Sequence, residues 1–174
     1  MVISRFTNST YVKDKIGGII GNVDDSSIAA TILRAQDFYI GTILNYKSCN
    51  YYYELMERNE NETLTTQEQE LVTYYIQPAL AEWTYYLLCG EISNRLTNKG
   101  VIQEGYEKGN PADKDNKVLK DYEIKAMAIH YTDIMKNYLF CNRSYFPTLL
   151  FPEEYTKGLD NIGGGDIELY LGPY

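Results

Sequence analysis

Residues 65–100 read TTQEQELVTYYIQPALAEWTYYLLCGEISNRLTNKG, and this stretch decides the fold. It starts with Thr65 and, three residues later, Glu68, a capping-box pair whose side chains satisfy each other's backbone N–H groups at a helix start. Apolar residues then recur mostly at intervals of three and four, the period of one helix face. They are Val72, Ile76, Ala79, Trp83, Leu87, Leu88, Ile92 and Leu96. We therefore expect the longest helix of the protein here.

Two residues should shape this helix. Pro78 lacks a backbone donor and crowds the carbonyl of Tyr74, so we expect a kink there. Gly100 suits a left-handed stop, so we expect the helix to end near residues 97–100.

An earlier helical face begins after Asp24 and Asp25, which offer an N-cap. Its apolar residues step by three and four: Ile28, Ile32, Ala35, Tyr39, Ile43 and Tyr46. Because Gly41 interrupts this face, we expect a close helix crossing or a break there. A short helix within residues 7–17 should precede it. The apolar cluster 51–56 should follow it, ahead of a polar loop at 57–61.

The last helix should run from about residue 118 to residue 141. It carries two apolar faces, one with Tyr122, Ala126 and Ile129, and one with Ile124, Met127, Tyr131, Met135 and Tyr138. Two such faces imply a central position, or burial against a neighbouring subunit as well. Before this helix, residues 101–117 (VIQEGYEKGNPADKDNK) are polar and rich in glycine. They predict a loop that resembles a hairpin, with its tip near residues 109–110.

These elements predict a mainly α fold: a small bundle of three to five helices over residues 1–147, followed by an extended C-terminal arm over 148–174. Within the arm, Gly163, Gly164 and Gly165 form a candidate hinge. The segment behind it alternates apolar and polar side chains as a strand does: Asp166, Ile167, Glu168, Leu169, Tyr170 and Leu171. A lone strand needs a sheet edge or groove to dock on. It is therefore either a partner-binding segment or a tail that is disordered or packs back.

Composition narrows the class of protein. With 174 residues, 44% of them hydrophobic, the chain is long enough for one domain with a core. A net charge of −8 argues against general nucleic-acid binding, which needs a basic face. No apolar run approaches the roughly 20 residues that span a bilayer, and the start lacks a signal peptide, so we expect no membrane contact and a cytoplasmic origin. Tyrosine is abundant, at 18 residues, which favours extensive protein contact, although a biased genome composition would produce the same excess.

The search for catalytic residues finds little. Known phosphate-binding, hydrolase and zinc motifs are absent from the sequence, and we expect no cofactor and no metal site. Cys49, Cys89 and Cys141 are widely spaced and suggest reduced thiols. An enzyme would have to rest on His130, the single histidine, with Asp133 one turn away.

With the elements in place, the chain resembles the head–tail connector (adaptor) proteins of tailed bacteriophages, and most of all the versions in crAss-like phages. The residues that carry this resemblance are helix-packing segments in a fixed order: 28–37 (IAATILRAQD), 39–44 (YIGTIL), 76–83 (IQPALAEW), 97–101 (TNKGV), 138–141 (YLFC) and 145–147 (YFP). The tyrosine content and the long terminal arm depart from the pattern.

The resemblance implies a structural protein of the virion neck, present in the host cytoplasm during assembly. It implies a homo-oligomeric ring, a dodecamer, that joins the portal protein to a lower neck or tail protein and lines the DNA exit channel. DNA would pass through without sequence-specific binding, and the arm would dock on the portal. Two alternatives stay open: another neck or tail-completion ring, and a cytoplasmic helical module that binds a protein partner.

Overall fold

The computed structural model describes residues 5–17, 23–45, 50–97, 100–103 and 112–149, and within these the side chains of 92–120 are left out of the description. The described chain is a mainly α-helical bundle, as the sequence predicts. Its helices are α1 (Ser9–Ile16), α2 (Asp25–Ala35), α3 (Gly41–Leu44), α4 (Tyr51–Glu60), α5 (Thr66–Glu70), α6 (Gln77–Ser93) and α7 (Ala112–Cys141). Two π-helical turns, η1 (Gln36–Ile40) and η3 (Leu71–Ile76), join α2 to α3 and α5 to α6, and a 3-10 turn, η4 (Arg143–Tyr145), follows α7.

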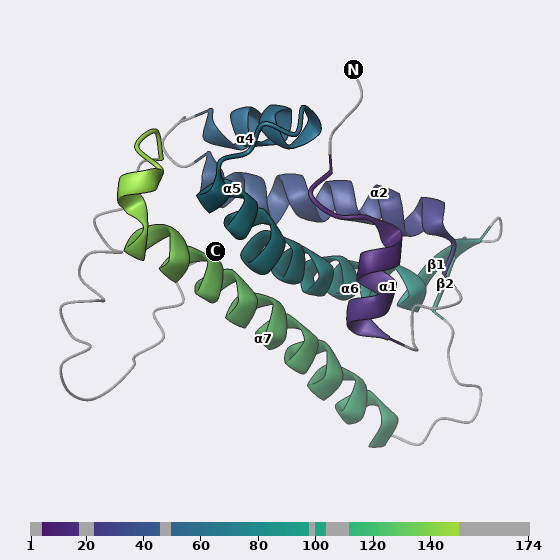
Figure 1. The fold of residues 1–174 in the computed structure, drawn as a ribbon. Coiled ribbons are helices and arrows are strands. Elements are labelled where there is room, and N and C mark those ends of the chain that lie inside the picture. Colours follow the sequence, from purple (N-terminus) through teal and green to yellow (C-terminus); the bar gives the residue numbers. More distant parts are fainter. Residues whose placement is uncertain (1–4, 18–22, 46–49, 98–99, 104–111, 150–174) are drawn as a thin grey trace, which may run out of the picture.

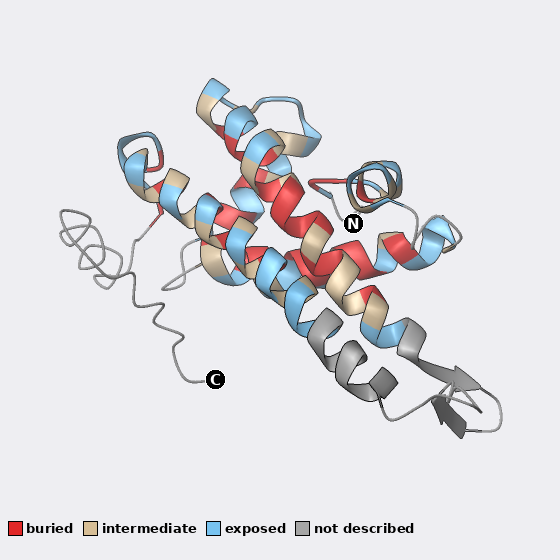
Figure 2. Cartoon of the chain, turned by 90° about the horizontal axis from the view of Figure 1, so that it is seen from below, coloured by how far each residue is buried: buried red, intermediate tan, exposed pale blue. Residues whose placement is uncertain are grey.

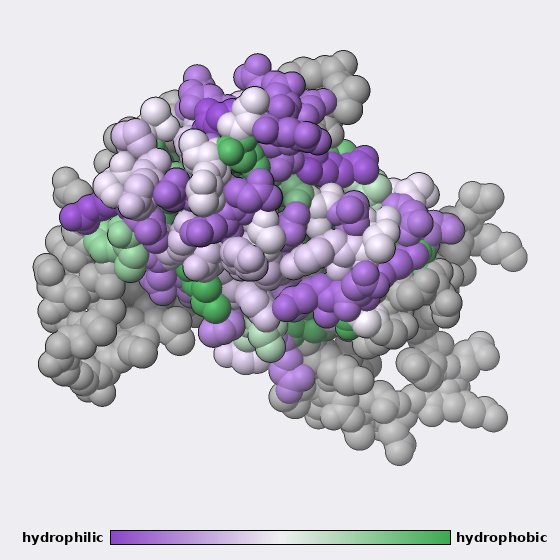
Figure 3. Space-filling model, viewed as in Figure 1, coloured by the Kyte–Doolittle hydropathy of each residue, from purple (hydrophilic) through white to green (hydrophobic). Residues whose placement is uncertain are grey.

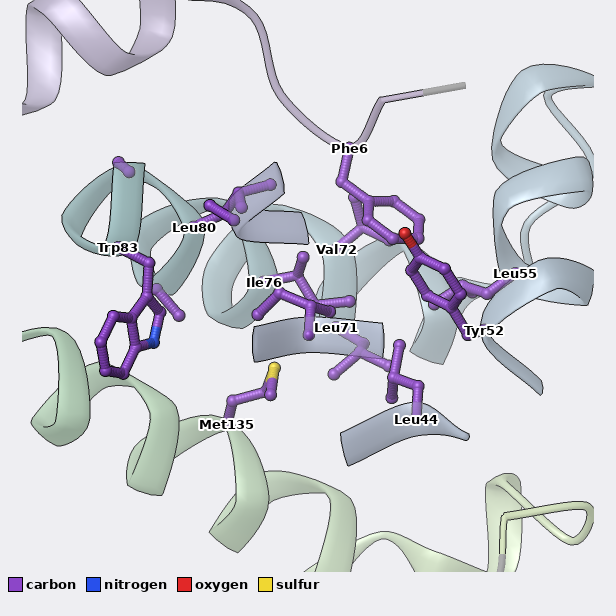
Figure 4. Packing of buried hydrophobic residues seen from close by; sticks show 14 of the residues in the cluster. Phe6, Leu44, Tyr52, Leu55, Leu71, Val72, Ile76, Leu80, Trp83 and Met135 are labelled. Atoms are coloured by element: carbon purple, nitrogen blue, oxygen red, sulfur yellow. The ribbon is translucent and has the colours of Figure 1, made fainter. Parts of the chain in front are cut away.

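The run α5–η3–α6 is the centre of the bundle, and α1, α2 and α7 pack around α6 (Figure 1). The capping box is present: Thr65 Oγ1 accepts from the Glu68 N–H, and the Glu68 carboxylate accepts from the Thr65 N–H. Buried residues concentrate where α2, α6 and α7 face one another (Figure 2). Leu71, Ile76 and Met135 meet in this core (Figure 4).

A wide turn lies directly before Pro78, where the sequence predicts a kink. In η3, the Gln77 N–H donates to the carbonyl of Val72, five residues earlier, immediately before the proline. A π-turn of this kind re-arranges the hydrogen bonds next to a residue that cannot donate one.

The predicted hairpin lies earlier in the chain than expected. Strands β1 (Asn94–Thr97) and β2 (Gly100–Gln103) pair antiparallel with Asn94 opposite Gln103, so the central helix ends at Ser93 and Gly100 belongs to a strand. Residues 112–117 are already part of α7, so the predicted loop over 101–117 is wrong at both ends, and 104–111 lie outside the described residues. Pro111 followed by acidic Asp113 is a combination favoured at helix starts, a signal that the glycine-rich composition concealed.

Three smaller expectations are also corrected. The longest helix described is α7, with 30 residues, and not the one expected within 65–100, because α6 has 17 residues and is followed by β1. Residues 57–60 continue α4, so the polar stretch there is a helix and not a loop. On α7 the buried face consists of Ala128, Thr132, Met135 and Leu139, whereas Tyr122, Ala126 and Met127, which belong to the two predicted apolar faces, are exposed.

Candidate interaction surface

The wide turn η1 is held to its surroundings by three of its first four residues. Gln36, which is fully buried, accepts from the Phe6 N–H at 2.9 Å and donates to the Tyr52 hydroxyl at 3.1 Å. The Tyr52 hydroxyl in turn donates to Asp37 Oδ1 at 2.5 Å. Burial, followed by this bond to the carboxylate, raises the pKa of Tyr52. Gln36 and Asp37 therefore tie η1 to α4 and to the N-terminal segment.

Tyr39 ties the same turn to α6 and α7. Its ring stacks on Trp83, with centroids 3.6 Å apart and planes 8° apart. The Trp83 indole N–H donates to Thr132 Oγ1 of α7 at 2.8 Å, and the indole itself is 4% exposed. The stack therefore extends from the surface into the core, where Figure 4 places Trp83 between α6 and α7.

Phe38 stands between these anchored residues and points outward, with 68% of its surface exposed. Its ring meets Tyr39 edge-on, with centroids 4.9 Å apart. A shallow depression lies beside it, lined by Arg34, Asp37, Phe38, Tyr39 and Leu87. A large apolar side chain on a backbone that its neighbours fix has the properties of an interface anchor, because little conformational freedom is lost on binding.

The second wide turn, η3, repeats this arrangement. Tyr74 is 69% exposed. The next residue, Tyr75, stacks on Tyr138 of α7, with centroids 4.0 Å apart. In both turns an exposed aromatic residue precedes one that stacks on a neighbouring helix. Because π-turns are rare and occur often at functional sites, their coincidence with exposed aromatic rings marks a candidate interaction surface.

Exposed residues of α7 add a third apolar feature, with Met127 and Ile134 on one flank of its buried stripe and Tyr122 on the other. Tyr122, Met127 and Ile134 are 73%, 48% and 37% exposed. Figure 3 shows apolar patches along the course of α7, on a face that is otherwise mostly polar. Phe38, Tyr74 and these three residues of α7 are hereafter the exposed apolar set. Tyr53 of α4 and Tyr145 of η4 are also exposed, at 58% each.

The possible catalytic pair does not form a recognisable acid–base site. His130 is exposed on α7, and its ring lies edge-on to Tyr131. The carboxylate of Asp133 lies 3.3 Å from Lys136 Nζ. Among the described residues, no three His, Cys, Asp or Glu side chains are grouped to hold a metal ion. None of the helices in the described part of the chain has the length and apolar character needed to cross a membrane.

The predicted hinge and partner-binding segment lie outside the described residues, which end at Leu149: Gly163, Gly164, Gly165, Asp166, Ile167, Glu168, Leu169, Tyr170 and Leu171. Sequence reasoning missed Phe38 and Tyr74. A signal was present in the adjacent aromatic pairs 38–39 and 74–75, because neighbouring residues of a helix point about 100° apart, and the first of each pair lies off the apolar period that its neighbour continues.

A family model described as a family of unknown function (DUF6712) matches residues 40–158, more than half of the chain. The match includes η3 with Tyr74 and the whole of α7, and it begins two residues after Phe38. No curated protein and no solved structure matches the chain.

Proposed function

This chain belongs to the DUF6712 family, whose function is unknown, and we propose that it is a non-catalytic assembly protein of a tailed bacteriophage. It forms a homo-oligomeric adaptor ring, a dodecamer, in the virion neck, between the portal protein and a lower neck or tail protein. The resemblance of its helix-packing segments to head–tail connectors supports this role. The protein resides in the host cytoplasm until it assembles.

The observation that carries the proposal is the exposed apolar set. Phe38 and Tyr74 extend from turns that stack against the core, and α7 exposes Met127 and Ile134. A solitary soluble protein gains nothing from fixing large aromatic side chains in water, whereas an interface does. A closed ring needs two dissimilar contact faces on each subunit, and apolar features on separate elements, η1, η3 and α7, meet that need.

The terminal segment has its own place in the proposal. Residues 166–171 dock on the portal or on the neighbouring subunit, and Gly163, Gly164 and Gly165 act as the hinge. Ile167, Leu169 and Leu171 would supply the apolar face of the docked strand.

The acidic balance fits a channel that DNA passes without adhering. The net charge of −8 opposes phosphate binding, because like charges repel. Adding lysines to the loop that faces the channel should therefore retain DNA and slow its ejection. Ejection at the normal rate from such particles would remove this part of the proposal.

The test of the ring is size-exclusion chromatography with light scattering on the chain, with and without portal protein. We expect a ring-sized species, or a ring bound to portal, for the wild type. Phe38→Asp should weaken it, whereas Ser26→Asp, which adds the same charge at an exposed site on α2, should not. Because a ring can require the portal as its template, the sample that contains portal protein is the one that tests whether a ring forms.

Other outcomes select the alternatives. A small oligomer that ignores portal would favour the cytoplasmic protein-binding module. Binding to a tail protein but not to portal would favour a different neck or tail-completion ring, and an image of the particle neck would identify which. If His130→Ala abolished a biological activity while assembly stayed intact, the non-catalytic assignment would be wrong.

A further inference from the structure

The N-terminal residues 5–7 are attached to the bundle in the way that a peptide ligand is attached to a receptor. The Phe6 N–H donates to Gln36 Oε1 at 2.9 Å, and the Phe6 carbonyl accepts from Gln77 Nε2 at 2.8 Å. Asn59 Nδ2 lies 3.4 Å from the Arg5 carbonyl. Side chains from three separate elements therefore hold a short stretch of backbone that belongs to no helix or strand.

The site is built for one aromatic residue in an extended chain. Both backbone groups of Phe6 are satisfied, and its ring is 2% exposed, edge-on to Tyr52 with centroids 6.2 Å apart. Gln36, one of the two clamping side chains, is itself fully buried. Peptide-binding domains recognise ligands by the same combination of main-chain hydrogen bonds and a side-chain pocket.

The two clamping residues also stand at the ends of the two wide turns. The carbonyl of Gln36 accepts the five-residue hydrogen bond from the Gly41 N–H that closes η1. The N–H of Gln77 donates the corresponding bond to Val72 that closes η3. The backbone of each clamp residue thus closes a wide turn while its side chain holds Phe6. The position of Phe6 and the geometry of both turns are therefore mechanically linked.

We propose that residues 5–7 are a built-in peptide ligand whose docking on Gln36 and Gln77 fixes η1 and η3, and with them the outward positions of Phe38 and Tyr74. This inference rests on the proposed function only in taking those two side chains as interface anchors. The ligand class is an extended peptide with an aromatic residue between two amide side chains, and the occupant is the protein's own N-terminal segment.

The consequence of undocking follows from helix geometry. If the segment undocks, the Oε1 atom of the buried Gln36 loses the Phe6 N–H as a donor, and the loss of a hydrogen bond at a buried polar group is unfavourable. Closing the wide turn to an ordinary one redirects the side chains within it, Phe38 and Tyr39 among them, and rotates the residues beyond it by about 100° relative to those before it, because one residue of an α-helix spans that angle. Tyr39 would then leave Trp83, and Phe38 would leave its outward position.

The chain contains a single tryptophan, Trp83, which reports on this stack directly. We would measure its emission maximum and the near-ultraviolet circular dichroism of the isolated full chain in Phe6→Ala and Gln77→Ala. Gln69→Ala is the matched control, because this exposed glutamine bonds within its own helical run, to Thr73. Far-ultraviolet circular dichroism verifies that each variant keeps its helix content.

We expect a red-shifted emission and a reduced near-ultraviolet signal in both clamp variants, with the control unchanged. Should Phe6→Ala fail to fold, Phe6→Leu and Gln77→Ala carry the test. Spectra of the clamp variants that coincide with wild type would overturn the proposal. This measurement uses no assembly partner. Its result therefore does not depend on whether the protein forms a ring, and a failure of this proposal would not count against the ring.

Discussion

At the scale of single residues, Glu68 is a buried carboxylate that accepts hydrogen bonds from three other residues. It accepts from Arg58 Nη2 at 2.6 Å, from the Tyr51 hydroxyl at 3.1 Å and from the Thr65 N–H at 3.0 Å, and it is 5% exposed. Burial alone would raise the pKa of this carboxyl. The bonds from Thr65, Arg58 and Tyr51 outweigh that effect and hold the pKa below its ordinary value.

A lowered carboxyl pKa sets the sign of the pH dependence. The charged form is favoured in the folded state, so the contribution to stability is present above the unfolded pKa of roughly 4.3 and is lost as the pH falls through the lower, folded value. Glu68→Gln should therefore reduce the free energy of unfolding by about 1–3 kcal/mol at pH 7. Urea unfolding should show this difference narrowing as the solution is made more acidic than about pH 4. Glu60→Gln, at an exposed position on α4, is the control. A difference in the free energy of unfolding between wild type and Glu68→Gln that stays constant down to pH 3 would contradict a lowered pKa for Glu68.

Trp83 is the residue that joins η1, α6 and α7. Thr132→Val removes the hydroxyl that accepts from the buried Trp83 indole N–H and should lower the free energy of unfolding by about 1–2 kcal/mol. Thr132→Ser keeps the hydroxyl and should lower the free energy of unfolding by less. Trp83→Ala should cost about 3–5 kcal/mol, because the side chain is almost fully buried. Denaturant titration followed by far-ultraviolet circular dichroism measures both. Equal stability of the valine and serine variants would mean that the hydrogen bond contributes nothing.

At the scale of elements, Gly41 shows how closely two helices approach. A Cβ atom at this position would lie 3.5 Å from Tyr52 Cε1 and 3.6 Å from the Gln36 carbonyl oxygen, which is ordinary contact distance, and its φ of −58° is helical. The sequence indicated a close crossing or a break here. The Tyr52 ring of α4 packs over the position at ordinary contact distance, and the backbone stays helical through Gly41, so the structure has a helix contact here and, in place of a break, the wide turn η1 directly before it.

Gly41→Ala should therefore stabilise the protein by about 0.5–1 kcal/mol, since alanine loses less backbone entropy in a helix. Gly90→Ala, in α6, has open space around its Cβ and should gain a similar amount. Gly41→Val should lose stability because its larger side chain meets the Tyr52 ring. Thermal unfolding of Gly41→Ala, Gly90→Ala and Gly41→Val measures these differences. If Gly41→Ala lowers stability while Gly90→Ala raises it, the Tyr52 ring cannot move to make room for the added methyl group.

The two wide turns lead to a prediction about their exposed rings. Phe38→Ala and Tyr74→Ala remove side chains that are 68% and 69% exposed, so each should change the free energy of unfolding by no more than about 0.5 kcal/mol. Both should nevertheless weaken assembly on the portal in a pull-down. Tyr39→Ala is the contrast, because it removes a ring that stacks on Trp83 and should lower stability. If Phe38→Ala and Tyr74→Ala both assemble on the portal as well as wild type does, neither side chain is part of the interface.

The elements differed in how well the sequence predicted them. The α5–η3–α6 run was predictable because its capping box and apolar face agree. The wide turn η3 was not predicted, because Pro78 indicates a kink and not a π-turn before it. The hairpin at 94–103 was predicted too late in the chain. Leu96 fits the apolar spacing of the helix that ends at Ser93, and strands of four residues are too short to show a clear alternation of apolar and polar residues. The exposed rings of η1 and η3 escaped notice because Phe38 and Tyr74 lie outside the helical periods that define the predicted core faces.

At the scale of the whole molecule, the described core extends to Leu149, which is 5% exposed. Deleting residues 163–174 should therefore leave helix content and the unfolding midpoint unchanged while abolishing portal binding. Replacing Ile167 and Leu169 with Asp should imitate the deletion, at about 1.5–3 kcal/mol of binding free energy for each apolar side chain that no longer docks. Circular dichroism and a portal pull-down provide the two readouts. A truncated chain that aggregates or unfolds would mean that this segment packs on its own subunit.

The bundle as a whole followed from composition and period, but the division of α7 between core and surface did not. Its apolar residues are spread around the helix, so the sequence could not distinguish a face that meets α6 from one that meets solvent or a neighbour. The contact that decides is Thr132, a polar residue buried by its hydrogen bond to Trp83. Hydropathy assigns such a residue to the surface.

Cys141, the last residue of α7, has a consequence for experiment. Its thiol is on the exposed side, whereas Cys89 is half-buried and burial raises the pKa of that thiol. Because maleimides react with the thiolate, Cys141 should be modified much faster at neutral pH. In a Cys49→Ser background a single dye can then be attached to a native side chain at the tip of the longest helix, and subunit joining can be followed by energy transfer between labelled copies.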